Sequence, residues 1–173
     1  MSATTRPVFR GRIIELRVEE VTLPNGHRVT LEVVHHPGAA AIVAVDAAGA
    51  VPLLRQYRHA VGGYIWEVPA GTLGPDEAPE ACARRELREE TGLVAAQWSA
   101  LGSIVTTPGF CDERIHLFLA RELGDAAQAL DADEVLTVER VPLARALDMV
   151  RDGTIEDAKS IAALTRAAAR LAR

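Results

Sequence analysis

Residues 71–93 read GTLGPDEAPEACARRELREETGL, and this stretch decides what the rest of the chain can be. Pro79 lies near its start, acidic residues come early, no β-branched residue occurs from 77 to 90, and Gly92 follows Thr91 directly. These are the start and stop signals of a helix, so the sequence predicts a helix over residues 77–91. The glycines of the preceding loop allow a tight turn and a close approach of the backbone to a ligand.

Three carboxylates share one face of the predicted helix. Glu86, Glu89 and Glu90 have the spacing i, i+3 and i+4, which places them on roughly the same side. At about 5–6 Å each pair repels by about 3 kcal/mol at an effective dielectric of 20, and the negative end of the helix dipole adds to this. A solvated acidic face is the simplest interpretation. Arginine partners on the same helix, or a hard divalent cation such as Mg²⁺, are the alternatives.

The whole stretch resembles the Nudix box, G-x5-E-x7-R-E-U-x-E-E-x-G-U, in which U is an aliphatic residue. All nine specified positions are met, by Gly71, Glu77, Arg85, Glu86, Leu87, Glu89, Glu90, Gly92 and Leu93. The flanks LLRQYRHAVGGYIWEVPAG and TTPGFCDERIHLFLA are similar to the ADP-ribose pyrophosphatase branch of that family. That branch carries a proline after the box, and here Pro108 follows Leu93 by fifteen residues. A plain Pro-Gly turn is the alternative interpretation.

The resemblance implies Mg²⁺-dependent hydrolysis of ADP-ribose to AMP and ribose 5-phosphate, with Mn²⁺ as an alternative ion. It implies four metal ligands, namely Glu86, Glu90, Glu89 and the backbone carbonyl of Ala70. It makes Gly71, Glu77 and Arg85 structural members of the box, because in the family the acid and the arginine brace the loop against the helix. Direct metal binding by Glu77 is the alternative.

The catalytic base in this branch is a glutamate on a loop well after the box, which corresponds here to residues 131–134. Glu134 is the first candidate and Asp133 is the alternative, although an acidic loop is often simply solvated. Glu89 is a further catalytic candidate, and so is Glu113, which would lie near the metals or the terminal ribose.

Substrate-binding candidates lie outside the box. By resemblance Arg58 contacts phosphate, whereas a salt bridge on the sheet face is the alternative. Arg55 alternates with it on the same strand, and period-two alternation places Gln56 and Arg58 on one face. Trp66 either stacks on a base or belongs to the core. The remaining candidates are Arg12 and Glu32, which match positions that in this branch reach the nucleotide across a dimer, and Pro108.

The rest of the chain alternates strands with a few helices. Residues 8–21 and 27–36 read as strands joined by an Asn-Gly turn, and strands follow at 39–45, 51–57, 64–68, 98–106, 114–120 and 134–141. Helices are predicted at 143–151 and 156–172. This pattern predicts an α+β fold, a mixed α/β/α sandwich. The resemblance specifies the Nudix fold at residues 39–173, preceded by a β-segment at residues 1–38 that packs between subunits of a homodimer.

Composition restricts the class of protein. The 173 residues are 49% hydrophobic and 25% charged, as in an ordinary globular domain. A net charge of −5 disfavours nucleic acid as a partner, and with one lysine, Lys159, any anion site is expected to use arginine. Two cysteines are too few for a disulfide scaffold. The start of the chain lacks an apolar run and no stretch suits a membrane span, so we expect a cytoplasmic protein.

Three other functions remain to be compared with the first. The protein could hydrolyse another nucleotide sugar or dinucleotide, such as GDP-mannose or NADH. A catalytically inactive domain that senses ADP-ribose is less favoured, because all four acids of the box are present. RNA decapping is disfavoured by the acidic balance and the lack of a basic stripe.

Overall fold

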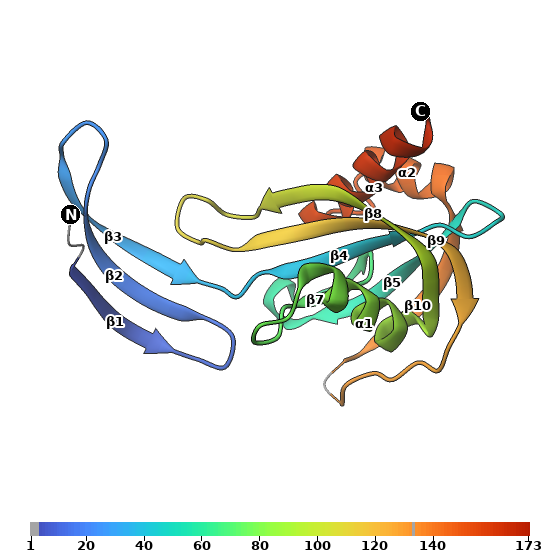
Figure 1. Ribbon diagram of the computed structural model, residues 1–173, viewed down its shortest axis with the longest axis horizontal. Helices are drawn as coiled ribbons and strands as arrows, with labels where there is room; N and C mark the ends of the chain where they lie inside the picture. The colour runs from blue at the N-terminus through green and yellow to red at the C-terminus, as the bar shows by residue number, and fades with distance from the viewer. Residues whose placement is uncertain (1–3, 133) are drawn as a thin grey trace.

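The computed structural model describes residues 4–132 and 134–173, as ten strands, one 3-10 helix (η1, His59–Val61) and three α-helices (Figure 1). None of the described helices is both long and apolar enough to cross a membrane.

The first three strands form a separate sheet that projects from the body (Figure 1). They are antiparallel in the order β1 (Thr4–Arg10), β2 (Glu15–Thr22) and β3 (Arg28–His35). Gly26 has a φ of 86° in the turn between β2 and β3, as an Asn-Gly turn favours. The single strand predicted over residues 8–21 is wrong, because the chain turns at residues 11–14, where the Gly11 N–H donates to the Ile14 carbonyl at 2.9 Å.

The body contains two further sheets. The larger has the order β7-β4-β9-β8, with β4 and β9 parallel, and consists of β4 (Ala39–Ala44), β7 (Ala70–Thr72), β8 (Leu93–Val105) and β9 (Arg114–Asp125). The smaller has the order β10-β5-β6 and consists of β5 (Ala50–Arg58), β6 (Gly63–Glu67) and β10 (Leu136–Pro142). The strands β8 and β9 run longer than predicted, because their ladder continues from Val105 opposite Arg114 to Leu93 opposite Asp125.

Strand β4 lies between two hydrophobic cores, because all six of its side chains are buried. Ala41 and Val43 belong to a cluster with β5, α2 (Leu143–Arg151) and α3 (Ala158–Leu171). Ile42, on the other face, belongs to a cluster with α1 (Pro79–Thr91). The fold is therefore the mixed α/β/α arrangement expected from the sequence, with one hydrophobic core on each face of β4.

The helix α1 ends where the sequence predicts and begins two residues later. Gly92 has a φ of 67°, and its N–H donates to the Arg88 carbonyl at 2.9 Å, which closes the last turn. Pro79 is the first helical residue, as suits a residue without an N–H. Glu77 lies before the helix in a turn, where its N–H bonds to the Gly74 carbonyl at 3.1 Å.

Candidate active site

A cavity of about 740 Å³ lies between the body and the turn that joins β1 to β2. Its walls come from α1, β5, β7, the loops around residues 106–113 and 131–134, and the start of α3. Arg12 and Ile13, from the turn between β1 and β2, also line it. A second cavity, of about 560 Å³, lies around Asp46, Arg121 and Arg140 and is lined by one residue of the box, Leu93.

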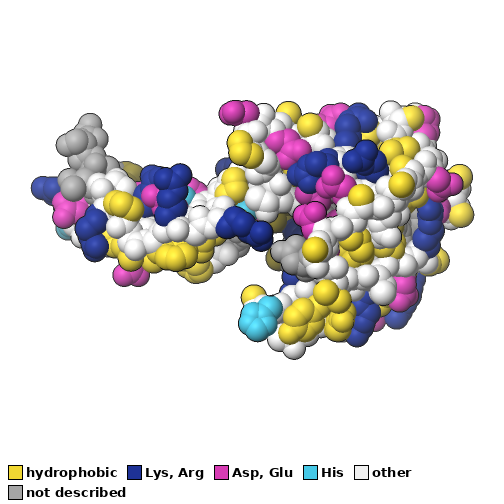
Figure 2. Space-filling model, turned by 90° about the horizontal axis from the view of Figure 1, so that it is seen from below, with side chains coloured by type: hydrophobic (Ala, Val, Ile, Leu, Met, Phe, Trp, Pro, Cys, Tyr) yellow, Lys and Arg dark blue, Asp and Glu magenta, His cyan; other side chains and the backbone are white. Residues whose placement is uncertain are grey.

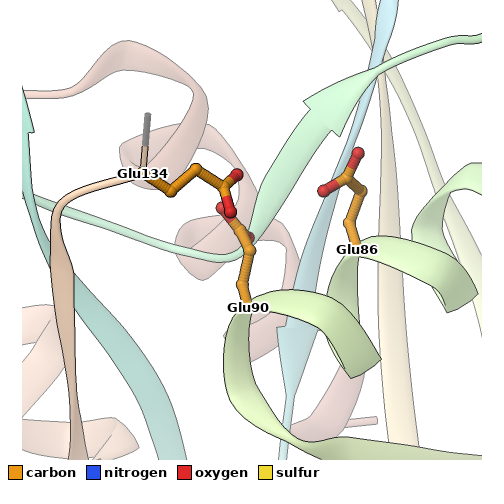
Figure 3. Close-up of side chains that lie close together, drawn as sticks. All are labelled: Glu86, Glu90 and Glu134. Atoms are coloured by element: carbon orange, nitrogen blue, oxygen red, sulfur yellow. The ribbon is translucent and has the colours of Figure 1, made fainter. Parts of the chain in front are cut away.

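Three carboxylates converge in the larger cavity (Figure 3). Glu86 and Glu90 come from successive turns of α1, and Glu134 comes from the loop before β10. One oxygen of each lies within 4.8 Å of the others. Glu86 and Glu90 are buried, at 7% and 1% exposure, whereas Glu134 is half-buried.

Burial and the neighbouring acids oppose the ionisation of Glu86 and Glu90. Burial, followed by the charge of Glu86, raises the pKa of Glu90 to about 9. Burial also raises the pKa of Glu86 above its usual range. Carboxylate oxygens are the ligands that hard divalent cations prefer, and a cation would compensate the charges that burial opposes. The donor set therefore fits Mg²⁺ or Mn²⁺.

Arg85 ties the box loop to the helix. Its Nε and Nη2 donate to the two oxygens of Glu77 at 2.9 and 3.0 Å, and its Nη1 donates to Glu86 at 2.6 Å and to Glu89 at 3.0 Å. Glu77 also accepts from the Gly74 N–H at 2.8 Å. The Arg85 hydrogen bond, against a smaller effect of burial, lowers the pKa of Glu77 to about 2. Glu89 is thus held by Arg85 and is not a member of the three-acid cluster.

Ala70 and Gly71 lie directly against the two buried acids. The Ala70 N–H donates to Glu90 Oε2 at 2.9 Å, and Ala70 and Gly71 both line the cavity. A Cβ atom at Gly71 would lie 1.8 Å from Glu86 Oε1 and 2.0 Å from Glu86 Cδ. The Glu86 carboxylate therefore occupies the space that any side chain at position 71 would need.

We expect Gly71→Ala to displace Glu86 and to lower the free energy of unfolding by about 1–3 kcal/mol, as overpacking usually does. Chemical denaturation with and without Mg²⁺ would measure this. Gly63→Ala is the matched control, because a Cβ atom there meets nothing within 4 Å. Equal stability of the two variants would show that the loop moves aside and that the contact is not required.

The loop before β10 holds Glu134 in place. Glu134 Oε2 accepts from the Asp131 N–H at 2.8 Å, and the Glu134 N–H donates to the Asp131 carbonyl at 3.0 Å. Asp133, the alternative base, lies outside the described residues. Glu113 also lines the cavity, but its carboxylate accepts from Thr106 Oγ1 at 2.9 Å and is not a member of the acid cluster.

The structure divides the substrate-binding candidates into two groups. Arg12 and Arg58 line the cavity. Arg55 instead stacks over the rings of Trp66 and Tyr64, at 5.5 and 5.9 Å, and Trp66 packs against the core. Arg55 and Trp66 are not among the residues that line the cavity. Glu32, which is exposed on β3, and Pro108 do not line it either.

The NUDIX domain family matches residues 34–164, which is most of the chain. The chain belongs to the NUDIX family. It is 42% identical to the ADP-ribose pyrophosphatase of Bacillus subtilis (strain 168) over 159 residues, covering 91% of this chain and 86% of that one. It is 43% identical to the ADP-ribose pyrophosphatase of Mycobacterium tuberculosis, covering 92% and 78%.

Two more relatives of this NUDIX protein extend the comparison. The methanol dehydrogenase activator of Bacillus methanolicus is 40% identical, with 92% of this chain and 88% of that one covered. The crystal structure of an ADP compounds hydrolase has a TM-score of 0.83 at 24% identity, covering 98% of this chain and 92% of that one. The last likeness shows that the two proteins share a fold over almost their whole length.

Sequence reasoning missed two residues of the NUDIX cavity. Lys159, the single lysine, lines it from the start of α3, although we expected any anion site to use arginine alone. Gln56 is 5% exposed and also lines it, and its Oε1 has no hydrogen-bond partner among the described residues. The alternation on β5 places Gln56 beside Arg58, but no motif marks Lys159.

Proposed function

We propose that this NUDIX protein hydrolyses the pyrophosphate bond of ADP-ribose, with water, to AMP and ribose 5-phosphate. The observation that carries the proposal is the cluster of the buried Glu86 and Glu90 with the half-buried Glu134, in a cavity that Arg12 and Arg58 also line. Two relatives above 40% identity are named ADP-ribose pyrophosphatase, and they support this choice of substrate.

We propose that Glu86 and Glu90, with the carbonyl of Ala70, hold Mg²⁺. When bound, the ion neutralises phosphate charge and acidifies a water molecule. Arg85 donates a hydrogen bond to Glu86, and the Ala70 N–H donates one to Glu90. These hydrogen bonds orient both carboxylates in the absence of the ion. Glu89 is a ligand through water in this proposal, because its carboxylate lies outside the cluster of Glu86, Glu90 and Glu134.

The other residues orient the substrate and move the proton. Arg58 binds a phosphate oxygen, and Arg12 reaches the cavity from the N-terminal sheet. In this proposal Glu134 accepts the proton of the attacking water, because its carboxylate lies within 4.8 Å of those of Glu86 and Glu90. The water oxygen bonds to one phosphorus atom, the bond from that atom to the bridging oxygen breaks, and the other product leaves with the bridging oxygen. The proton taken by Glu134 is passed to solvent.

Incubation with Mg²⁺ and ADP-ribose, followed by chromatography, tests the proposal. We expect AMP and ribose 5-phosphate in equal amounts, and no turnover after metal removal with a chelator. GDP-mannose and NADH, assayed side by side, should be poorer substrates by kcat/KM. A higher kcat/KM for either would reassign the substrate, and binding of ADP-ribose without turnover would favour the sensor.

We also propose that the segment 1–38 joins two copies of the chain in a cytoplasmic homodimer. Its sheet exposes apolar side chains, including Val8 at 50%, Phe9 at 56% and Leu31 at 43%, and Figure 2 shows a hydrophobic band along the projecting arm. A second copy that covers this band would remove apolar surface from water. A C2 dimer is also the commonest soluble oligomer.

Analytical ultracentrifugation tests the dimer. We expect the parent to sediment at twice the mass of the 18.6 kDa chain, and Phe9→Glu to sediment as a monomer because a charge would be buried in the interface. Leu171→Glu, on the exposed end of α3, is the control and should remain dimeric. A monomeric parent at micromolar concentration would contradict the proposal.

A further inference from the structure

A buried carboxylate lies behind one wall of the cavity and is not among the residues that line it. Glu67, the last residue of β6, is 1% exposed. It accepts two hydrogen bonds from Arg58, from Nε at 2.7 Å and from Nη2 at 2.8 Å, and one from Lys159 Nζ at 2.5 Å. One acid thus holds two cations that come from different elements, β5 and α3.

The two cations make this buried charge stable. Burial by itself raises the pKa of Glu67, but the hydrogen bond from Arg58 and the charge of Lys159 outweigh it and hold the pKa below its usual range. The same hydrogen bond raises the pKa of Arg58. Glu67 is therefore ionised at neutral pH, because its hydrogen-bonded cationic partners compensate the charge that burial opposes.

Both cations keep donors that Glu67 does not use. Arg58 uses Nε and Nη2 for Glu67, and its Nη1 makes no hydrogen bond to any residue in the described parts of the chain. The Lys159 ammonium group donates one hydrogen bond to Glu67 and one, at 3.1 Å, to Asp157. One of its three N–H donors remains. Since Arg58 and Lys159 both line the cavity, these free donors are available to a ligand there.

Hydrogen bonds at the start of α3 hold the helix turn that carries Lys159. Asp157 caps the helix by accepting from the Ser160 N–H at 2.9 Å, and Ser160 Oγ accepts from the Val68 N–H at 2.8 Å. The helix is therefore attached to the residue that directly follows Glu67. Lys159 is only 13% exposed, so its ammonium group has little freedom to leave this position.

We propose that Glu67 is a positioning residue that fixes Arg58 and Lys159 as one cationic pair, and that this pair binds the pyrophosphate of the substrate. The inference rests on the proposed function, because it names the residues that hold the two phosphates while the acid cluster acts on them. The arginine contributes a planar donor group and the lysine a point charge, which suit two different phosphate oxygens. Glu67 itself touches no substrate.

The test compares Glu67→Gln, Lys159→Met and the double variant with the parent. The affinity for ADP is measured by calorimetry with Mg²⁺ present, and KM and kcat are measured with ADP-ribose. We expect each single variant to raise the Kd for ADP and the KM about tenfold, as loss of a charged hydrogen bond does, with kcat much less affected. The double variant should be no weaker than the weaker single variant, since both changes disrupt one unit.

Two further variants separate positioning from folding. Lys159→Arg keeps the charge and should restore most of the affinity, while Glu139→Gln, at an exposed position on β10, should bind like the parent. If Glu67→Gln lowers the melting temperature but leaves the Kd and the KM within twofold, Glu67 is only structural. If the losses in the double variant multiply, the two residues act independently. Either result overturns the inference.

The two proposals can fail separately. A parent that binds ADP but does not hydrolyse ADP-ribose contradicts the proposed function, while the Kd values for ADP still decide whether Glu67 positions the pair. A parent that binds no ADP contradicts the inference directly, because the pair would then hold no pyrophosphate.

Discussion

Replacement of Glu90 by glutamine should lower kcat for ADP-ribose about 10³-fold, because a metal ligand contributes several kcal/mol of transition-state stabilisation. A glutamine oxygen can still accept the Ala70 N–H, which donates to Glu90 at 2.9 Å. The variant therefore keeps the local hydrogen bond and loses the charge. Steady-state kinetics with saturating Mg²⁺ measure the effect.

The same variant should be more stable than the parent when metal is absent and the pH is high. In the folded chain the pKa of Glu90 is raised to about 9 from an ordinary value of 4.5. The group's contribution to stability is therefore fully present below pH 4.5 and is lost as the pH rises through about 9. Glutamine cannot ionise, so Glu90→Gln should lose less stability than the parent over this range.

Thermal melting in the presence of a chelator, at several pH values from about 5 to 9, measures this second effect. Glu80→Gln, an exposed substitution on the same helix, is the control and should follow the parent in both assays. Added Mg²⁺ should raise the melting temperature of the parent most at high pH, since binding displaces protons from its ligands. A kcat within tenfold of the parent would contradict the role given to Glu90.

Glu134→Gln should lower kcat about 10²- to 10⁴-fold with little change in KM, which is the range for loss of a general base. The amide can still accept the Asp131 N–H, as Glu134 does at 2.8 Å, but it cannot take a proton from water. Asp131→Asn is the matched control. Asp131 lines the same cavity without belonging to the acid cluster, so its variant should keep most of the activity.

A titration with Mg²⁺ distinguishes the two roles open to Glu134, which lies within 4.8 Å of Glu86 and Glu90. If Glu134 is the base, the concentration of Mg²⁺ that gives half-maximal activity should be the same in the variant and the parent. If it is a metal ligand, that concentration should rise strongly. A rise with normal kcat at saturating Mg²⁺ would contradict the assignment as base.

The box helix could be predicted from sequence because its signals are local. Pro79, the early acids and Gly92 all act within one or two turns, and the spacing of Glu86 and Glu90 places them on one face without any tertiary contact. The alternation on β5 is local in the same sense. It separates Gln56 and Arg58, which line the cavity, from Arg55, which stacks on Trp66.

The pair of cations could not be predicted, because its contacts join distant parts of the chain. Lys159 donates to Glu67, which lies 92 residues earlier in the sequence, and no short sequence motif indicates this contact. The break between β1 and β2 was missed for a different reason. The turn at residues 11–14 contains one glycine, one arginine and two isoleucines but no Asn-Gly or Pro-Gly pair, so it carries only a weak turn signal.

Strand β4 restricts how this chain can change over evolutionary time. Its alternate side chains belong to two different cores, and its neighbour β7 carries Ala70 and Gly71. Insertion or deletion of one residue in β4 would exchange the two sets of side chains and shift the backbone against which Glu86 and Glu90 lie. Random mutagenesis with selection for activity should therefore recover length variants in the turn at 23–27 and none within residues 39–44.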